Sequence, residues 1–293
     1  MKNLSAVLIA GIAGSAMLLS GTAAGAVTTK GSPHAGPASI RAFNMPKGYT
    51  VVSNGPFDAA TGTQTHGSAS CPGTKQPAGG GAFVENGDNV AASINSSYPD
   101  GQTWELDVNN TTGTDTSFEV YVVCIAQSAG YKIATAAGVT GLGETDAAMD
   151  CPSGSKVIGG GVLSDTTNTG VNISTTTPYA LGNGHSGWEV FMSSTGDVSN
   201  FTVYSICHHK PAGWSVATGS SVSIPAGEQA EAVVSCPGDS VPLGGGSITQ
   251  FDESATTIDL NTDYPADNGW HIYESDGETT ATSLTASTVC AGT

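Results

Sequence analysis

Apolar and polar residues alternate along many short segments of this chain, and turn-forming residues separate the segments. Alternation with a period of two is typical of β-strands that bury one face. The clearest segments span residues 104–108, 119–124, 188–192, 201–207, 257–260 and 270–273. Clusters of Gly, Asn, Asp and Pro lie between them, and no window has the spacing of an amphipathic helix. The pattern predicts an all-β protein of short antiparallel strands packed like a sandwich.

The pattern of strands and turns repeats three times. Each repeat has a Cys-Pro turn, three glycines eight residues after that cysteine, a Tyr/Pro pair, a tryptophan and a closing cysteine. The matching aromatic residues near the start of each repeat are Tyr49, Tyr131 and Trp214. The period is too long for a thin solenoid, so it predicts three tandem β domains, 48–128, 129–211 and 212–293. Packing around a pseudo-threefold axis is one arrangement that this repeat allows.

The six cysteines organise these repeats. An even number of cysteines in a secreted chain indicates disulfides, and six cysteines allow 15 pairings. If each repeat folds by itself, the pairs are Cys71–Cys124, Cys151–Cys207 and Cys236–Cys290. Each bridge would then stabilise its domain by roughly 4 kcal/mol. The chain contains no Cys-x-x-Cys motif, which argues against zinc or redox chemistry.

The first residues have the pattern of a secretory signal peptide. Residues 1–26 contain Lys2, then a stretch rich in Ala, Leu and Ile, then the small residues Ala24-Gly25-Ala26. A membrane anchor is the alternative, but the apolar run is short and glycines interrupt it. We therefore expect a freely released extracellular protein without a membrane span. Residues 27–47 carry three basic residues and no acid, and they fit a flexible spacer or a basic arm that touches an anionic cell wall.

The composition excludes some partners. The chain has 25 Asp and Glu against 8 Lys and Arg, a net charge of −17 that repels nucleic acid. Acidic turns follow the glycine runs, at Glu85, Asp88, Asp165, Asp252 and Glu253. Such turns fit either Ca²⁺ binding or a solubilising surface. We predict no other cofactor and no dedicated metal ligands.

Motifs for catalysis are weak. The segment Gly184-His185-Ser186-Gly187 lacks the spacing of a hydrolase nucleophile elbow. None of the six histidines occupies the same position in all three repeats. These observations favour a non-catalytic binding protein. A secreted hydrolase with one site at a repeat junction, a protease inhibitor and a toxin component remain the alternatives.

The repeated segment that leads into each tryptophan is the best ligand candidate. Aromatic rings beside Asp and Asn suit a sugar, because the rings stack while the polar groups bind hydroxyls. The candidate residues are Tyr98, Asp100, Trp104, Tyr179, Asn183, Trp188, Tyr264, Asp267, Asn268 and Trp270. The alternative is that each tryptophan anchors the core of its repeat. Glycan is therefore the expected ligand class, with polysaccharide or a cell-surface glycan as the partner.

The combined pattern of Cys-Pro turn, Gly-Gly-Gly run, Gly-Trp step and closing strand ending in Cys resembles modules of secreted proteins from high-GC Gram-positive bacteria. The resemblance covers residues 48–292. It implies an extracellular location and a repeated β architecture, and no activity comes with it. A shorter similarity is to sandwich lectins whose final strands run Gly-Trp/Phe-x-Val, and it carries no site residues across.

Overall fold

The structure is a computed structural model that describes residues 45–85, 90–182, 184–196, 198–250 and 255–292. The chain divides into two units, Met1–Gly36 and Pro37–Thr293. All described residues belong to the second unit. The predicted signal peptide (1–26) and all but the last three residues of the predicted tail (27–47) lie outside the described residues. Within the described ranges, no helix is long and apolar enough to cross a membrane.

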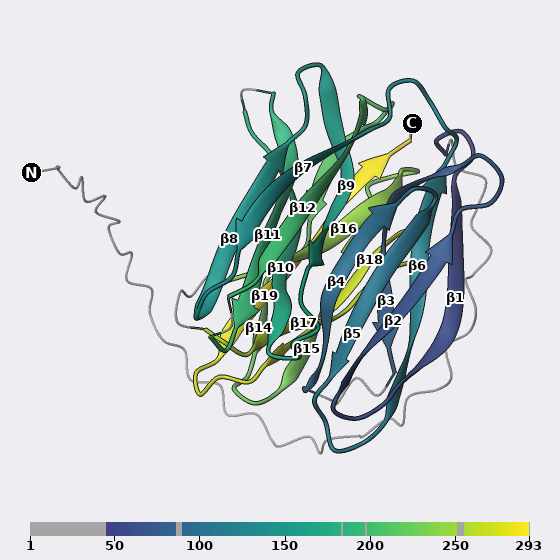
Figure 1. The fold of residues 1–293 in the computed structure, drawn as a ribbon. Coiled ribbons are helices and arrows are strands. Elements are labelled where there is room, and N and C mark those ends of the chain that lie inside the picture. The colour runs from purple at the N-terminus through teal and green to yellow at the C-terminus, as the bar shows by residue number, and fades with distance from the viewer. Residues whose placement is uncertain (1–44, 86–89, 183, 197, 251–254, 293) are drawn as a thin grey trace, which may run out of the picture. The chain divides into compact units, whose positions relative to one another are not determined.

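The described residues are all-β, as predicted, and form three sheets of antiparallel strands (Figure 1). Sheet A has the order β1 (Thr50–Ala59), β6 (Thr116–Ile125), β3 (Gln76–Val84), β17 (Ile258–Ala266), β18 (Gly269–Asp276) and β15 (Gln229–Ser235). Sheet B has the order β2 (Thr63–Ser70), β5 (Thr103–Asn110), β4 (Ala92–Asp100), β9 (Ser155–Ser164), β12 (Asn200–His209) and β7 (Lys132–Val139). Sheet C has the order β13 (Ser215–Thr218), β19 (Thr282–Ala291), β16 (Val241–Thr249), β10 (Val171–Ala180), β11 (Ser186–Ser194) and β8 (Gly143–Asp150), and β14 (Val222–Ile224) also pairs with β19.

Each sequence repeat is divided between two sheets. We call residues 48–128, 129–211 and 212–293 repeats 1, 2 and 3. Sheet A joins three strands of repeat 1 to three of repeat 3, sheet B joins repeats 1 and 2, and sheet C joins repeats 2 and 3. This corrects the expectation of three domains that fold separately. Among the described strands, no repeat forms a complete sheet by itself, because backbone hydrogen bonds connect strands of one repeat to strands of another.

The three joins between repeats use matching positions. They pair β3 with β17, β4 with β9 and β10 with β16. The paired residues are Ala82 with Asp263, Ser97 with Val162, and Thr176 with Ser247. Beside each join a backbone N–H donates to a hydroxyl at 3.1 Å: Val84 to Thr262, Ser164 to Ser96, and Thr249 to Thr175. These side-chain acceptors satisfy backbone groups that the short joins leave without a ladder partner.

The glycine runs let the repeats approach one another closely. The first glycines of the runs meet, since a Cβ on Gly244 would lie 2.7 Å from the Cα of Gly159. Each second glycine lies against a tryptophan, and a Cβ on Gly160 would lie 2.3 Å from the Cγ of Trp188. Each third glycine lies at a join, where a Cβ on Gly81 would lie 1.8 Å from the carbonyl oxygen of Asp263. Any larger residue would push these backbones and rings apart.

The three tryptophans are core anchors. Trp104, Trp188 and Trp270 are at most 1% exposed. Their indole N–H groups donate to Ser97 Oγ at 2.9 Å, to Thr176 Oγ1 at 2.7 Å, and to the carboxylate of Asp263. Each acceptor is also the residue that pairs across a join between repeats. One buried ring therefore fills the interior and fixes the position where the next repeat attaches.

The predicted disulfides are confirmed. Cys71 bonds to Cys124, Cys151 to Cys207 and Cys236 to Cys290. Each bridge closes a loop within one repeat, with sequence separations of 53, 56 and 54 residues. Three such bridges fit an oxidising, extracellular environment.

Candidate functional site

The outer faces of sheets A and B each carry two tyrosines that come from different repeats. On sheet A, Tyr264 of repeat 3 contacts Tyr121 of repeat 1, with ring centroids 5.3 Å apart. On sheet B, Tyr98 of repeat 1 stacks on Tyr204 of repeat 2 at 5.6 Å. A strand with glycine at this level separates each pair, and its bare backbone leaves room for the rings to meet. The joins between repeats therefore create both tyrosine pairs.

The larger of the two aromatic groups lies on sheet A. We call Phe83, Tyr121, Tyr264, His271 and Tyr273 the sheet A surface. Strand alternation explains the arrangement, because β18 directs Trp270 and Ile272 into the core and the residues between them outward. Tyr264, only 3% exposed, lies at the centre and also contacts Phe83 and His271 at 5.5 Å each. The rings therefore support one another and hold a fixed surface.

Two carboxylates border the sheet A surface. Tyr121 donates its hydroxyl proton to Glu119 Oε2 at 2.6 Å, and Glu231 Oε1 lies 2.9 Å from Nδ1 of His271. Burial is the main cause that raises the pKa of Tyr264 to about 12. The tyrosines are thus neutral hydrogen-bonding groups at physiological pH, and the carboxylates are strong acceptors. The surface combines apolar ring faces with polar groups at its edges.

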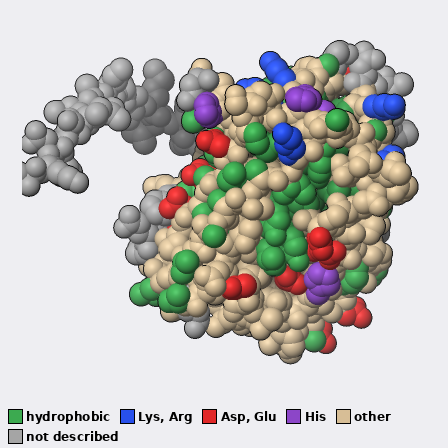
Figure 2. All heavy atoms as spheres, turned by 45° about the horizontal axis from the view of Figure 1, so that its top comes forward, with side chains coloured by type: hydrophobic (Ala, Val, Ile, Leu, Met, Phe, Trp, Pro, Cys, Tyr) green, Lys and Arg blue, Asp and Glu red, His purple; other side chains and the backbone are tan. Residues whose placement is uncertain are grey.

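The second group lies on sheet B. We call Tyr98, Tyr204, His66, Glu105 and Asp107 the sheet B surface. His66 is exposed, and its two ring nitrogens lie 2.9 Å from Glu105 and 3.0 Å from Asp107. Burial, followed by the nearby carboxylates of Asp107 and Glu105, raises the pKa of Tyr98 to about 12. Figure 2 shows one face of the molecule with this kind of composition, a band of hydrophobic side chains with a histidine and carboxylates gathered at its lower end.

Sheet C lacks the tyrosine pair. Its residue opposite the third glycine of the run, Gly246, is Ser287, where sheets A and B have tyrosine. Thr177 occupies the position that corresponds to Tyr98 and Tyr264. Tyr179 stands two residues later, and its hydroxyl donates to Asp150 at 2.7 Å. Two of the three sheets therefore carry the complete arrangement.

The structure divides the predicted ligand residues into two groups. Tyr98 and Tyr264 lie on the aromatic surfaces, and Tyr179 lies on sheet C. The expectation that tryptophans stack on a sugar is corrected for Trp104, Trp188 and Trp270, because their rings are buried. The alternative, that each tryptophan anchors the core, describes them instead.

The remaining predicted ligand residues lie in turns. Asp100 ends β4 and Asp267 lies in the β17–β18 turn, and both are exposed. The carboxylate of Asp100 contributes to the raised pKa values of Tyr98 and Tyr204, and that of Asp267 to the raised pKa of Tyr264. Asn268 has a structural contact, because its side-chain N–H donates to the carbonyl of Cys236 at 3.1 Å. Asn183 lies outside the described residues.

The second tyrosine of each pair was not among the predicted ligand residues. Tyr121 and Tyr204 each stand three residues before the closing cysteine, Cys124 and Cys207. This Tyr-x-x-Cys pattern, present in two repeats out of three, was the available signal. Its meaning depended on knowing which repeat lies next to which.

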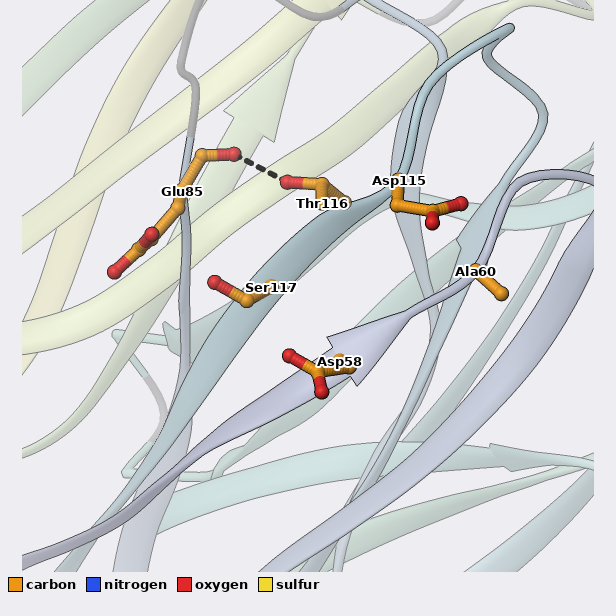
Figure 3. Close-up of a pocket in the computed structure, with 6 residues that line it drawn as sticks. All are labelled: Asp58, Ala60, Glu85, Asp115, Thr116 and Ser117. Carbon is orange, nitrogen blue, oxygen red and sulfur yellow. Dashed lines mark hydrogen bonds between the residues drawn. The ribbon is translucent and has the colours of Figure 1, made fainter.

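A separate cavity of about 390 Å³ lies at the ends of β1 and β6. Its lining includes the carboxylates of Asp58, Glu85 and Asp115 (Figure 3). Figure 3 shows the carboxylates of Glu85 and Asp115 directed to opposite sides, while Thr116 donates to the carbonyl of Glu85 at 2.6 Å. Among the described residues, no group of three or more His, Cys, Asp or Glu is placed to hold a metal ion. Of the predicted acidic turns, Asp88, Asp252 and Glu253 lie outside the described residues, and Asp165 instead accepts the backbone N–H of Asn200 at 2.9 Å.

Repeat 3 also buries carboxylates in the core. Burial raises the pKa of Asp259 to about 7 and that of Glu274 to about 8, and it raises the pKa of Asp263 well above its usual range. Asp263 accepts the Trp270 N–H, and Ser193 donates to Asp259 at 2.7 Å. Asp263 and Glu274 therefore lie inside the core, whereas Asp259 is half-buried beside it.

Comparison with known proteins adds no family. A scan against protein-family models finds no match, and a search of curated proteins finds no significant match. The two aromatic surfaces are therefore the features of this chain that bear most directly on its function.

Proposed function

We propose that this chain is a non-catalytic, extracellular carbohydrate-binding protein whose sheet A and sheet B surfaces bind glycan chains. The observation that carries the proposal is the pairing of tyrosines from different repeats on two open sheet faces, next to fixed carboxylates. The C–H faces of a pyranose ring are apolar and stack on aromatic rings. Its hydroxyls donate to carboxylates and phenol oxygens.

The rigidity of the surfaces supports this proposal. Tyrosine provides a large contact area with little loss of conformational entropy on binding. The rings project from strands of shared sheets and contact one another. Their side chains therefore lose little conformational freedom when a ligand binds. Two surfaces on one chain would also increase the overall affinity for a polymer.

The proposed location follows from two features. Residues 1–26 have the sequence of a signal peptide, and all six cysteines form disulfides. Secretion and membership of the repeat module of high-GC Gram-positive bacteria are parts of the same proposal. A sheet-based glycan-binding surface fits a protein released near a cell wall or a polysaccharide substrate.

The test measures retention of the secreted protein on immobilised polysaccharides such as cellulose, xylan and chitin. Tyr121→Ala should weaken retention through sheet A, and Tyr204→Ala should weaken it through sheet B. Each substitution removes one aromatic ring of a tyrosine pair. The binding free energy should fall by roughly 1 kcal/mol, which is about fivefold in affinity. The double variant should elute close to a non-binding protein.

Tyr179→Ala is the control, because it removes a partly exposed tyrosine from sheet C, where Ser287 stands in place of the second tyrosine. It should bind like the wild type. Thermal melts must show that all variants are folded. Unchanged retention of the Tyr121→Ala/Tyr204→Ala variant, or no retention of the wild type on any polysaccharide, would overturn the proposal.

A further inference from the structure

Sheet A is strongly acidic. Its six strands contain no Lys or Arg. They contain seven acids, of which Asp58, Glu119 and Glu231 lie outside the core. Burial raises the pKa of the other four, Asp259, Asp263, Glu274 and Asp276, so these contribute less negative charge. The whole chain adds to this field with its net charge of −17. An anionic ligand would be repelled from this sheet, and a cationic one would be attracted.

Two of these acids face the sheet A surface from opposite sides. Glu119 lies on β6 opposite Phe83, and Glu231 lies on β15 opposite Tyr273. β6 and β15 are four strand positions apart in the sheet, or about 19 Å at the usual spacing of neighbouring strands. The carboxylates therefore stand at the two ends of a row of rings, a span that fits a short oligosaccharide lying across the strands.

Aromatic faces and carboxylates together favour a particular class of ligand. The face of an aromatic ring has a negative potential and attracts cations, and a carboxylate strengthens this attraction. We infer that the sheet A surface prefers glycans that carry protonated amines, such as polymers of glucosamine, over neutral and acidic glycans. This inference rests on the proposed carbohydrate-binding function and names the ligand of the same surface.

Sheet B offers an internal comparison. Its acids Glu105 and Asp107 both contact His66, Asp100 at the end of β4 is a third acid, and its strands include Lys132 and Lys156. The sheet B surface therefore has a weaker negative field than the sheet A surface. We expect the preference for amines to depend on sheet A.

The experiment is calorimetric titration of the full chain with four β-1,4-linked hexasaccharides, built from glucosamine, N-acetylglucosamine, glucose and glucuronate. It is done at mildly acidic pH, where the glucosamine amines are protonated, in a Tyr204→Ala background that weakens binding by sheet B. The glucosamine hexamer should bind about threefold to tenfold more tightly than the glucose hexamer, and the glucuronate hexamer should bind most weakly. High salt should remove this difference, because it screens half-exposed charges.

Glu119→Gln and Glu231→Gln test the two carboxylates. Each should lower affinity for the glucosamine hexamer by about twofold to fivefold and leave affinity for the glucose hexamer unchanged. The matched control is Asp239→Asn, which removes one charge from an exposed turn in the sequence after Cys236. It should change neither affinity.

The outcomes separate the two proposals. If the neutral hexamers bind as tightly as the glucosamine hexamer, or if both Gln variants keep the preference, the amine inference is wrong and carbohydrate binding stands. If no hexasaccharide binds, both proposals fail. If a lysine-rich peptide binds more tightly than every hexasaccharide, the surface recognises cationic protein segments, which also overturns both.

Discussion

The buried carboxyl group of Glu274 should lower the stability of this protein, and the size of this effect can be measured. Glu274 is fully buried on β18, four residues after Trp270. The corresponding residues after Trp104 and Trp188 are Val108 and Met192, and they are buried as well. Glu274→Met therefore gives repeat 3 the apolar residue that repeat 2 already has, with a side chain of similar length.

The expected gain follows from the pKa of Glu274. Burial is the main cause that raises this pKa from 4.5 to about 8, the carboxylates of Glu144 and Asp259 add to it, and hydroxyl donors such as Thr249 oppose it. Because the folded-state pKa is raised, the cost is absent below about pH 4.5 and grows as the pH rises to about 8. The full cost is on the order of 5 kcal/mol, and about 3 kcal/mol of it is present at pH 7.

The substitution removes this cost but also loses the hydrogen bond from Thr249, worth about 1 kcal/mol. We expect Glu274→Met to be more stable than the wild type by roughly 2 kcal/mol at pH 7 and by roughly 4 kcal/mol at pH 9. At pH 4 the burial cost is absent, and Glu274→Met should be less stable than the wild type by about 1 kcal/mol, the value of the lost hydrogen bond. Guanidinium unfolding curves at the three pH values measure these differences.

Met192→Glu is the reciprocal variant, and it should lose stability as the pH rises through the same window. Asp259 and Asp263 titrate in both the wild type and Glu274→Met, so the difference in stability reports Glu274 together with its electrostatic coupling to these two carboxyl groups. A difference that does not change with pH, or a variant less stable than the wild type at pH 9, would refute the assignment of Glu274 as a buried carboxyl group.

Three further predictions concern the joins, the valence and the disulfides. Gly161→Ala should lower the free energy of unfolding by more than about 2 kcal/mol in thermal melts, because its Cβ would lie 2.0 Å from a carbonyl oxygen of the neighbouring repeat. Gly182→Ala is the control, because nothing lies within 4 Å of its Cβ. Equal melting temperatures of the two variants would contradict the role of Gly161 at the join. Calorimetry with a glycan should show two sites per chain, one of which weakens about fivefold after Tyr121→Ala, so a single wild-type site would count against independent surfaces. Replacing both Cys151 and Cys207 by alanine should destabilise the protein by roughly 4 kcal/mol in denaturant, since the bridge closes a loop of 56 residues, and a loss below about 1 kcal/mol would be inconsistent with this estimate.

Sequence spacing within a repeat predicted one tyrosine of each pair on the aromatic surfaces and not the other. The Tyr/Pro pair identified Tyr98 and Tyr264, because each repeat carries it at a similar distance from its tryptophan. Their partners Tyr204 and Tyr121 stand in other repeats, 106 and 143 positions away along the chain. No spacing within a repeat predicts such contacts, since they depend on which sheet edges join. The tryptophans are similar in this respect. The sequence shows that they repeat, but only their packing against Gly80, Gly160 and Gly245 shows that their rings face inward.

The sequence by itself determined the all-β class, the division into three repeats and the disulfide pairing. These features depend on alternation and spacing within about 80 residues, which local geometry controls. The tertiary structure alone decided that the repeats share their sheets, that the three glycines of each run serve three different contacts, and that tyrosines meet across the joins. The physical reason is that the three strands which a repeat contributes to a sheet end in an edge strand with unpaired backbone N–H and C=O groups. Which strand pairs with that edge depends on how all three repeats pack together, and no local sequence pattern specifies it.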